Sequence, residues 1–324
     1  MHINQGIEQH EAGFARAIFV IDKDAFMELE THNSKFKYRY YTVADHTFAV
    51  GMPDGETGIA MPSYEPFVAD GAERLLFKLS VDDAFYPSKK GELIGDFDCG
   101  AADFGVYRLD DGSYQMLISP PGGDYCGLLQ ASPDFGVATI ATRGDDSLRT
   151  FAVNNALMLM YAFASAGMGT LLVHASVIKN RDKGFLFLGK SGTGKSTHSS
   201  LWLKHIEGSE LLNDDNPVVR INEAGAVVYG SPWSGKTSCY KNDSAPIGAF
   251  VQIKQEPENR IKRNLPLQAF AVLLPSMSAM KWDKRIYGNI CDSVGRLIER
   301  VPLYTLGCRP DQEAADVCYA EVMK

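Results

Sequence analysis

The stretch GFLFLGKSGTGKSTHSS, residues 184–200, passes from an apolar run through a glycine-rich loop into a segment with helical character. It contains the pattern G-x-x-x-x-G-K-[ST], which begins at Gly189 and ends at Ser196. In such a loop the glycines let consecutive backbone N–H groups point at phosphate oxygens, and the following helix adds its positive end. The lysine reaches the outer phosphates, and the hydroxyl after it binds Mg²⁺. The stretch therefore predicts a nucleotide-binding P-loop between a strand and a helix.

The predicted contacts to the nucleotide extend along this loop and include one lysine from a later segment. They are Gly189, Ser191, Gly192, Thr193, Gly194, Lys195, Ser196, Thr197 and Lys236. Lys236 belongs to GSPWSGKTSCY (230–240), a second segment bracketed by glycines, from which its ammonium could reach the transferred phosphoryl group. The alternative is an ordinary loop, because Ser-Pro and Ser-Gly are common loop dipeptides.

Two adjacent acids follow the loop after one helix and one short strand. Asp214 and Asp215 stand in LLNDDNPVV (211–219), where a Walker-B carboxylate is expected. Two neighbouring carboxylates can have different roles: one stays ionised and binds Mg²⁺, and the other acts as a general base that takes a proton from an acceptor hydroxyl. The alternative is a turn before Pro217, since Asp and Asn form turns readily.

His174 lies in TLLVHASVI (170–178), which reads as a strand joined to the loop strand by one tight turn. A lone histidine on an apolar strand is usually a hydrogen-bonded core residue, and the residues alone favour that interpretation. The tight turn nevertheless predicts that this strand lies beside the phosphates.

The order of these motifs resembles a known family. VHAS, then a strand, GKSGTGKST, a helix and LLNDD is similar to the bacterial HPr serine kinase/phosphorylase and its kinase-like relatives. It is similar, more distantly, to the nucleotide site of ATP-dependent phosphoenolpyruvate carboxykinase. The resemblance covers roughly residues 150–236 and is most specific over 172–215.

The resemblance implies roles for single residues. His174 stands at the family's active-site histidine, Asp214 at the proton-transferring acid and Asp215 at the metal-binding acid, while Lys195 and Ser196 match the P-loop pair. It further implies ATP and Mg²⁺ as cofactors and a twisted, mostly β core with flanking helices. Some members of the family are homo-oligomers, so it also implies that this chain can assemble with itself.

Short runs of β-branched and aromatic residues, separated by turn signals, fill the first half of the chain. The predicted strands include residues 15–22, 37–44, 47–52 and 74–81. Asp111-Gly112 predicts a type I′ hairpin turn. We expect an α+β protein: an antiparallel β-rich domain of unknown role over residues 1–147, then a P-loop kinase-like domain over 148–324.

Bulk composition restricts the class of protein. The 324 residues are 45% hydrophobic and 22% charged, with a formal charge of −8, which argues against a general nucleic-acid binder. Basic residues gather between 254 and 263, but two glutamates interrupt them. The six cysteines are widely spaced, which fits reduced thiols in a cytoplasm. The uncharged stretch 151–173 contains asparagines and glycines, so we expect a core helix and a following strand, with no membrane partner.

The leading hypothesis is an ATP- and Mg²⁺-dependent kinase that phosphorylates a hydroxyl group of a protein serine or a small molecule. Alternatives are a catalytically weak nucleotide-binding regulatory or assembly module and a carboxykinase-type lyase. A GTPase is disfavoured because no N-K-x-D motif is present, and an ABC-type ATPase because no LSGGQ-like segment is present.

Overall fold

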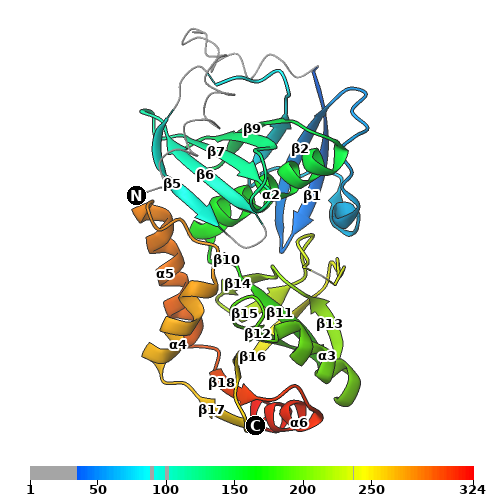
Figure 1. Cartoon of the computed structure of the whole chain (residues 1–324), viewed down its shortest axis with the longest axis vertical. Coiled ribbons are helices and arrows are strands. Elements are labelled where there is room, and N and C mark those ends of the chain that lie inside the picture. The colour runs from blue at the N-terminus through cyan, green and yellow to red at the C-terminus, as the bar shows by residue number, and fades with distance from the viewer. Residues whose placement is uncertain (1–34, 88–90, 99–101, 236) are drawn as a thin grey trace.

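The computed structural model describes residues 35–87, 91–98, 102–235 and 237–324, and it is an α+β fold built on two nine-stranded sheets. The sheets lie one above the other along the long axis of the molecule (Figure 1). This agrees with the predicted β-rich part followed by an α/β part. The predicted strand at 15–22 lies outside the described residues.

The first sheet has the order β3-β1-β2-β4-β9-β8-β7-β6-β5. Its strands are β1 (Phe36–Val43), β2 (His46–Pro53), β3 (Val68–Ala69), β4 (Lys78–Val81), β5 (Glu92–Asp98), β6 (Asp103–Arg108), β7 (Tyr114–Ser119), β8 (Gly127–Ala131) and β9 (Val137–Thr142). The prediction of an antiparallel sheet is wrong at its centre, where β4 runs parallel to both β2 and β9. Parallel neighbours cannot be joined by a tight hairpin, because the chain must return to the same end of the sheet before the second strand begins. The long connections before and after β4 provide this return.

The predicted type I′ turn is also corrected. Gly112 has a positive φ, but Asp111 is absent from the residues with positive φ. The Asp111 carboxylate accepts hydrogen bonds from the N–H and hydroxyl of Ser113, which stabilises another turn in a longer connection. Two-residue turns with φ > 0 at both positions occur instead at Ala44 and Asp45, between β1 and β2, and at Arg181 and Asp182 further along the chain.

The second sheet has the order β10-β14-β15-β16-β12-β11-β13, with β18 and β17 added beside β16. Its strands are β10 (Thr170–Leu172), β11 (Ala175–Asn180), β12 (Lys183–Leu188), β13 (Glu210–Asn213), β14 (Val218–Asn222), β15 (Gly225–Tyr229), β16 (Ser244–Gln255), β17 (Arg260–Arg263) and β18 (Leu303–Cys308). The long strand β16 pairs with β15 at its start and with β12 and β18 further on, so it joins the two parts of this sheet.

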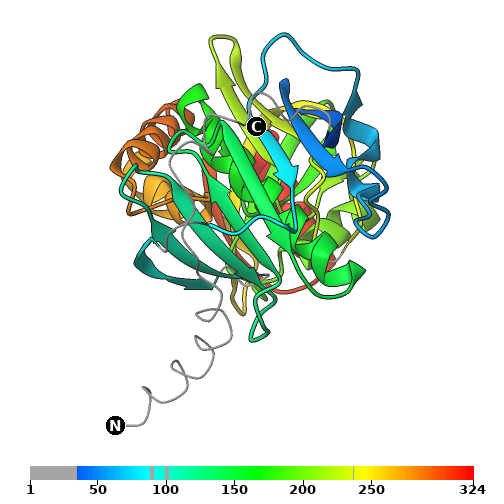
Figure 2. The ribbon, with the colours of Figure 1, turned by 90° about the horizontal axis from the view of Figure 1, so that it is seen from above.

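Helices lie on both faces of the second sheet. The helical segments are η3 (Pro62–Phe67), α2 (Asp146–Ser165), η4 (Ala166–Met168), α3 (Lys195–His205), α4 (Pro266–Leu273), η5 (Leu274–Ser276), α5 (Lys284–Ile298) and α6 (Gln312–Val322). Along β12, Phe185 and Phe187 pack with α3 and α6, whereas Leu186 and Leu188 join the core shared with the first sheet. Seen from above, α4 and α5 lie opposite the β1–β2 hairpin (Figure 2).

Helix α2 joins the two halves. It begins at Asp146, capped by the Asp145 carboxylate, so the predicted boundary between 147 and 148 falls inside its first turn. The helix contacts β7, β8 and β9 of the first sheet and β10 of the second. One continuous hydrophobic core includes side chains from both sheets. The division into two domains at this point stays a prediction.

The apolar stretch around 151–173 forms a core helix, as expected. The segment Asp146–Met168 is long and apolar enough to cross a membrane by length and composition, but 61% of its most apolar window is buried inside the protein. Its buried side chains pack into the shared core. The strand predicted to follow it is interrupted: β10 ends at Leu172 and pairs with β14, and β11 begins at Ala175 and pairs with β12.

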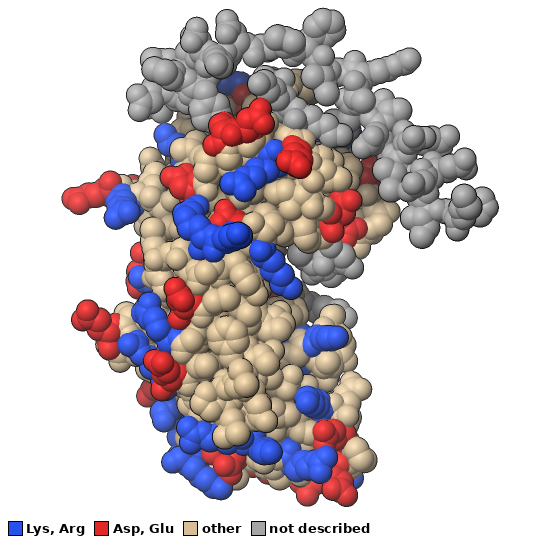
Figure 3. All heavy atoms as spheres, turned by 90° about the vertical axis from the view of Figure 1, so that its left-hand side faces the viewer, with Lys and Arg blue, Asp and Glu red and all other residues tan. Residues whose placement is uncertain are grey.

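Charged side chains of both signs are interspersed on the face that carries α4, α5 and β17 (Figure 3). Around β17 the Arg260 guanidinium pairs with the Glu256 carboxylate at 2.8 Å. This mixture is the arrangement expected from the alternating charges of residues 254–263. Of the cysteines in the described residues, Cys126, Cys239, Cys291, Cys308 and Cys318 are free thiols.

We expect stability to fall in mild acid because of buried His198. Its ring packs edge-on against Phe187 and accepts a hydrogen bond from Trp202 Nε1, and burial lowers its pKa from 6.5 to about 4. In the unfolded chain, His198 therefore binds a proton below pH 6.5, whereas in the folded chain it binds one only below about pH 4. This costs about 2 kcal/mol of unfolding free energy between pH 7.5 and 5.

The measurement is urea unfolding of wild type and His198→Gln at both pH values. Between pH 7.5 and 5, the unfolding free energy of the variant should fall by about 2 kcal/mol less than that of wild type. His205→Gln, at a partly exposed position on the same helix, is the matched control. An equal loss in wild type and His198→Gln would contradict the assignment.

Candidate active site

The strand directions bring the predicted site residues to one edge of the second sheet. β12, β13, β16 and β18 all run the same way, and β11 runs against them. The carboxyl ends of four strands and the amino end of β11 therefore share an edge. The loop follows β12, the two acids follow β13, and His174 precedes β11. Ligands of open α/β sheets bind at such edges.

The loop has the backbone that its glycines permit. Gly192 and Gly194 have φ of 81° and 104°, and Gly194 is the N-cap of α3. The Thr193 hydroxyl donates to the Lys190 carbonyl at 2.7 Å, which closes the turn. A strand before the loop and a helix after it are the context that a phosphate-binding loop requires.

A chain of polar contacts joins the loop lysine to the second acid. Lys195 Nζ lies 2.9 Å from His174 Nε2 and donates at 2.9 Å to the Gly189 carbonyl. His174 Nδ1 lies 3.0 Å from Asp215 Oδ1. A charged lysine can only donate, so His174 Nε2 accepts and the ring proton sits on Nδ1, facing Asp215. The carboxylate thus fixes the tautomer of the histidine.

Burial and nearby charges act on the pKa of Lys195 in opposite directions. Burial lowers the pKa of the Lys195 ammonium, and the negative charges of Asp215 and Asp214 act in the opposite direction. Its contacts to His174 and to the Gly189 carbonyl satisfy two of the three N–H donors. The ammonium is therefore positioned at the mouth of the loop, within the field of both acids.

The two acids have different surroundings. The Asp214 side chain is buried, and its Oδ1 accepts from the Ser176 hydroxyl at 2.8 Å, which in turn contacts the Ser199 hydroxyl of α3. Asp214 Oδ2 is buried and has no hydrogen-bond partner among the described residues. The Asp215 side chain is 25% exposed, and its second oxygen accepts from the Asn216 amide.

The segment from Ser231 to Gly235 covers the two acids. The Asn216 backbone N–H donates to the Trp233 carbonyl, and the Ser231 hydroxyl donates to the Asn216 carbonyl. A Cβ on Gly235 would lie 2.9 Å from the Asp214 carbonyl oxygen, so only glycine allows this approach. The predicted phosphate contact Lys236 lies outside the described residues.

A cavity of about 580 Å³ opens beside the loop. Its walls include Gly192–Gly194, Thr197 and Leu201 on one side and Ile253 and Pro257 on the other. The Gln255 amide donates to the Gly192 carbonyl, which joins the end of β16 to the loop. The volume lies within the range of small-molecule sites, and apolar and polar walls are both present.

The structure brings most of the predicted site residues together. His174, Lys195, Asp214 and Asp215 meet at the edge, whereas Ser191, Ser196 and Thr197 are exposed on the loop and the start of α3. Sequence reasoning missed Ser176, Ser199 and Asn216, which hold the acids. Among the described residues, no group of three or more His, Cys, Asp or Glu side chains forms a metal cluster.

Comparison with known proteins finds a distant structural likeness and no match in sequence. No family model matches the sequence, and no curated protein matches it. Among solved structures, the chain is similar to the HPr(Ser) kinase/phosphatase from Coxiella burnetii, with 11% identity over 47% of this chain and 88% of that chain and a TM-score of 0.29. This is a distant likeness to half of the chain, so the proposals below rest on the loop, the acids and their contacts.

We predict that Gly194→Ala damages the loop. A non-glycine residue at φ 104° costs on the order of 1–3 kcal/mol, and relief of that strain would turn the loop amides away from a phosphate. The variant should unfold at lower urea concentration and should bind a fluorescent ATP analogue at least tenfold more weakly.

Gly288→Ala is the matched control. This glycine lies inside α5, and a Cβ there would meet nothing within 4 Å. The change should raise the unfolding free energy by about 0.5–1 kcal/mol and leave analogue binding unchanged. Unaltered analogue binding in Gly194→Ala would remove the loop from the site.

Proposed function

We propose that the chain is a phosphotransferase of the kinase class. Within that class, it transfers the γ-phosphoryl group of ATP to a hydroxyl group of an acceptor and requires Mg²⁺. The observation that carries this proposal is the contact chain Lys195–His174–Asp215, which joins the phosphate-binding loop to an acid. Phosphoryl transfer needs hydrogen-bond donors to the phosphates, metal ligands and a proton acceptor within reach of one another. We assign these three roles to residues at this edge of the sheet.

In this proposal the loop amides and the Lys195 ammonium hold the phosphates, with support from the amino end of α3. The nucleotide base occupies the neighbouring cavity, where Leu201 and Ile253 provide apolar walls. When phosphates are bound, Lys195 turns toward them and leaves His174 Nε2. The cation then neutralises charge on the transferred group, at no cost of reorganising solvent.

The residues present fit a magnesium ion. Ser196 stands exposed at the first turn of α3, and Asp214 offers a buried oxygen that no described residue satisfies. A hard cation with oxygen ligands suits this pair. When bound, Mg²⁺ would neutralise charge on the phosphate oxygens. We therefore propose Ser196 and Asp214 as its protein ligands.

His174 is the better proton acceptor. Its side chain is 44% exposed and that of Asp215 is 25% exposed, whereas Asp214 is buried against α3. An incoming hydroxyl can therefore approach the histidine more easily than Asp214. Asp215 keeps the proton on Nδ1, so Nε2 is free to accept one once Lys195 has moved. These assignments move the metal ligand from Asp215 to Asp214 and the proton acceptor from Asp214 to His174, and we propose them on the basis of burial.

Three variants separate the roles. Asp214→Asn should weaken Mg²⁺-dependent binding of ATP. His174→Gln should leave that binding intact but lower phosphoryl transfer by about 10²–10⁴, because a positioned general base contributes about that factor. Asp215→Asn should lower transfer and shift its dependence on pH, because the histidine loses its orienting partner. His205→Gln is the control and should behave as wild type.

The assay uses γ-labelled ATP with Mg²⁺ and a lysate of host cells separated into protein and small-molecule fractions. Label that appears in either fraction, and disappears with His174→Gln, supports the kinase and identifies the class of acceptor. Asp214→Asn that binds ATP and Mg²⁺ normally yet transfers nothing would restore Asp214 as the base. No Mg²⁺-dependent ATP binding by the wild type would refute the proposal.

A further inference from the structure

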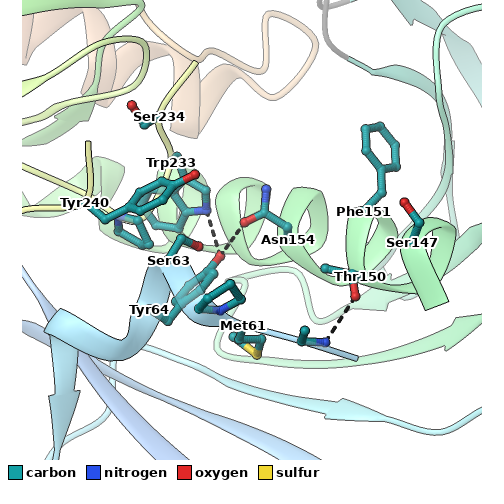
Figure 4. Close-up of a pocket in the computed structure, with 13 residues that line it drawn as sticks. Met61, Ser63, Tyr64, Ser147, Thr150, Phe151, Asn154, Trp233, Ser234 and Tyr240 are labelled. Atoms are coloured by element: carbon teal, nitrogen blue, oxygen red, sulfur yellow. Dashed lines mark hydrogen bonds between the residues drawn. The ribbon is translucent and has the colours of Figure 1, made fainter. Parts of the chain in front are cut away.

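A second cavity, of about 310 Å³, lies between the two halves of the chain (Figure 4). Its walls come from residues 60–64, from the first turns of α2, and from Pro232, Trp233, Ser234 and Tyr240. None of the thirteen residues that line it is charged. It shares no lining residue with the cavity beside the loop, so it is a separate site.

One face of α2 forms a wall of this cavity. Ser147, Thr150, Phe151 and Asn154 recur at helical spacing, and all four line the cavity (Figure 4). The Thr150 hydroxyl accepts from the Ala60 backbone N–H, which ties the wall to the segment before η3. The wall thus combines an aromatic ring with hydroxyl and amide groups.

A hydrogen-bonded chain crosses the base of the cavity. Trp233 Nε1 donates to the Tyr64 hydroxyl at 2.9 Å, and that hydroxyl donates to Asn154 Oδ1 at 2.9 Å. Burial raises the pKa of Tyr64 well above its usual value, so this hydroxyl stays protonated. With its oxygen engaged, Asn154 has an amide NH₂ with no partner among the described residues, available to a ligand.

The composition of the walls selects the occupant. Phe151, Trp233 and Tyr240 provide aromatic surface, and Ser63 and Ser147 provide hydroxyl groups that both donate and accept. No cation in the wall could meet a phosphate or carboxylate, and no carboxylate could meet an amine. Hydroxyl groups of a neutral ligand match these walls, and the apolar face of a sugar-like ring packs on aromatic surface.

The cavity is connected to the two acids by one short segment. Trp233 and Ser234 line the cavity, and the next residue, Gly235, lies against Asp214 and Asp215. The Trp233 carbonyl accepts from the Asn216 backbone N–H beside the second acid. A ligand that fixes residues 232–234 therefore acts on the backbone that covers the acids.

We propose that this cavity binds an uncharged, hydroxyl-bearing small molecule, and that its occupancy is coupled to the nucleotide site through residues 231–235. The binding itself is independent of phosphoryl transfer. If the kinase proposal failed, the cavity would keep its ligand, and the two proposals are therefore tested by different measurements.

The test is isothermal titration of the whole chain with neutral monosaccharides and polyols, and with charged counterparts that carry a phosphate, carboxylate or amino group. At least one neutral compound should bind, and its charged counterparts should bind at least tenfold more weakly. Ser147→Phe should abolish binding by filling the mouth, because Ser147 is exposed at the rim. Asn154→Asp should weaken it at least tenfold, because it keeps the size but removes the amide donor.

Ala320→Phe, an exposed position on α6, is the control for a new phenyl group on a helix and should bind as wild type. Cooperative urea unfolding of Ser147→Phe with the midpoint of wild type will show that the fold is intact. Coupling requires that the neutral ligand changes ATP affinity and that ATP changes ligand affinity by the same factor. Unchanged affinity in both directions would overturn the coupling.

Two results would overturn the binding site. The first is that no neutral compound binds, or that Ser147→Phe and Asn154→Asp bind it as tightly as wild type. The second is that a short neutral peptide binds while all sugars and polyols fail, which would assign the cavity to a peptide.

Discussion

The half-buried ammonium of Lys195 is the group on which the rest of this edge depends. A cation there loses hydration, and the protein compensates with a carbonyl oxygen, a histidine nitrogen and the nearby charges of two carboxylates. These groups come from three separate parts of the chain, so the positions of those parts must agree. The loop, the start of β11 and the end of β13 are thereby fixed relative to one another.

The order and direction of the strands make that agreement achievable. β11 lies between β12 and β13 and runs against both, so its first residues meet the last residues of its neighbours. His174, just before β11, therefore lies between the loop and the acids. The chain leaves the β10 pairing at Leu172 and enters the β11 pairing at Ala175, and His174 is one of the two residues between these strands. An uninterrupted strand would have directed this side chain into a packed face.

Local motifs were predictable, and contacts between distant segments were not. The loop, its strand and helix, and the pair of acids follow from residue types at fixed spacing, and the structure has a strand, a glycine loop and a helix in this order, with the acids after the next strand. The different burial of Asp214 and Asp215 could not be predicted, because it depends on Ser176 and Ser199 from two other elements. The parallel pairing of β4 was missed because alternation of apolar residues predicts a strand but not its direction.

Helix α2 packs against strands of both sheets, and this limits how the molecule can move. Many enzymes close over a substrate by rotating one lobe about a hinge. Such a rotation here would pull α2 from one of its two partners and open a void in a core that tolerates voids poorly. Closure over the ligands proposed above would instead come from short segments such as 231–235, while the two sheets keep their mutual orientation.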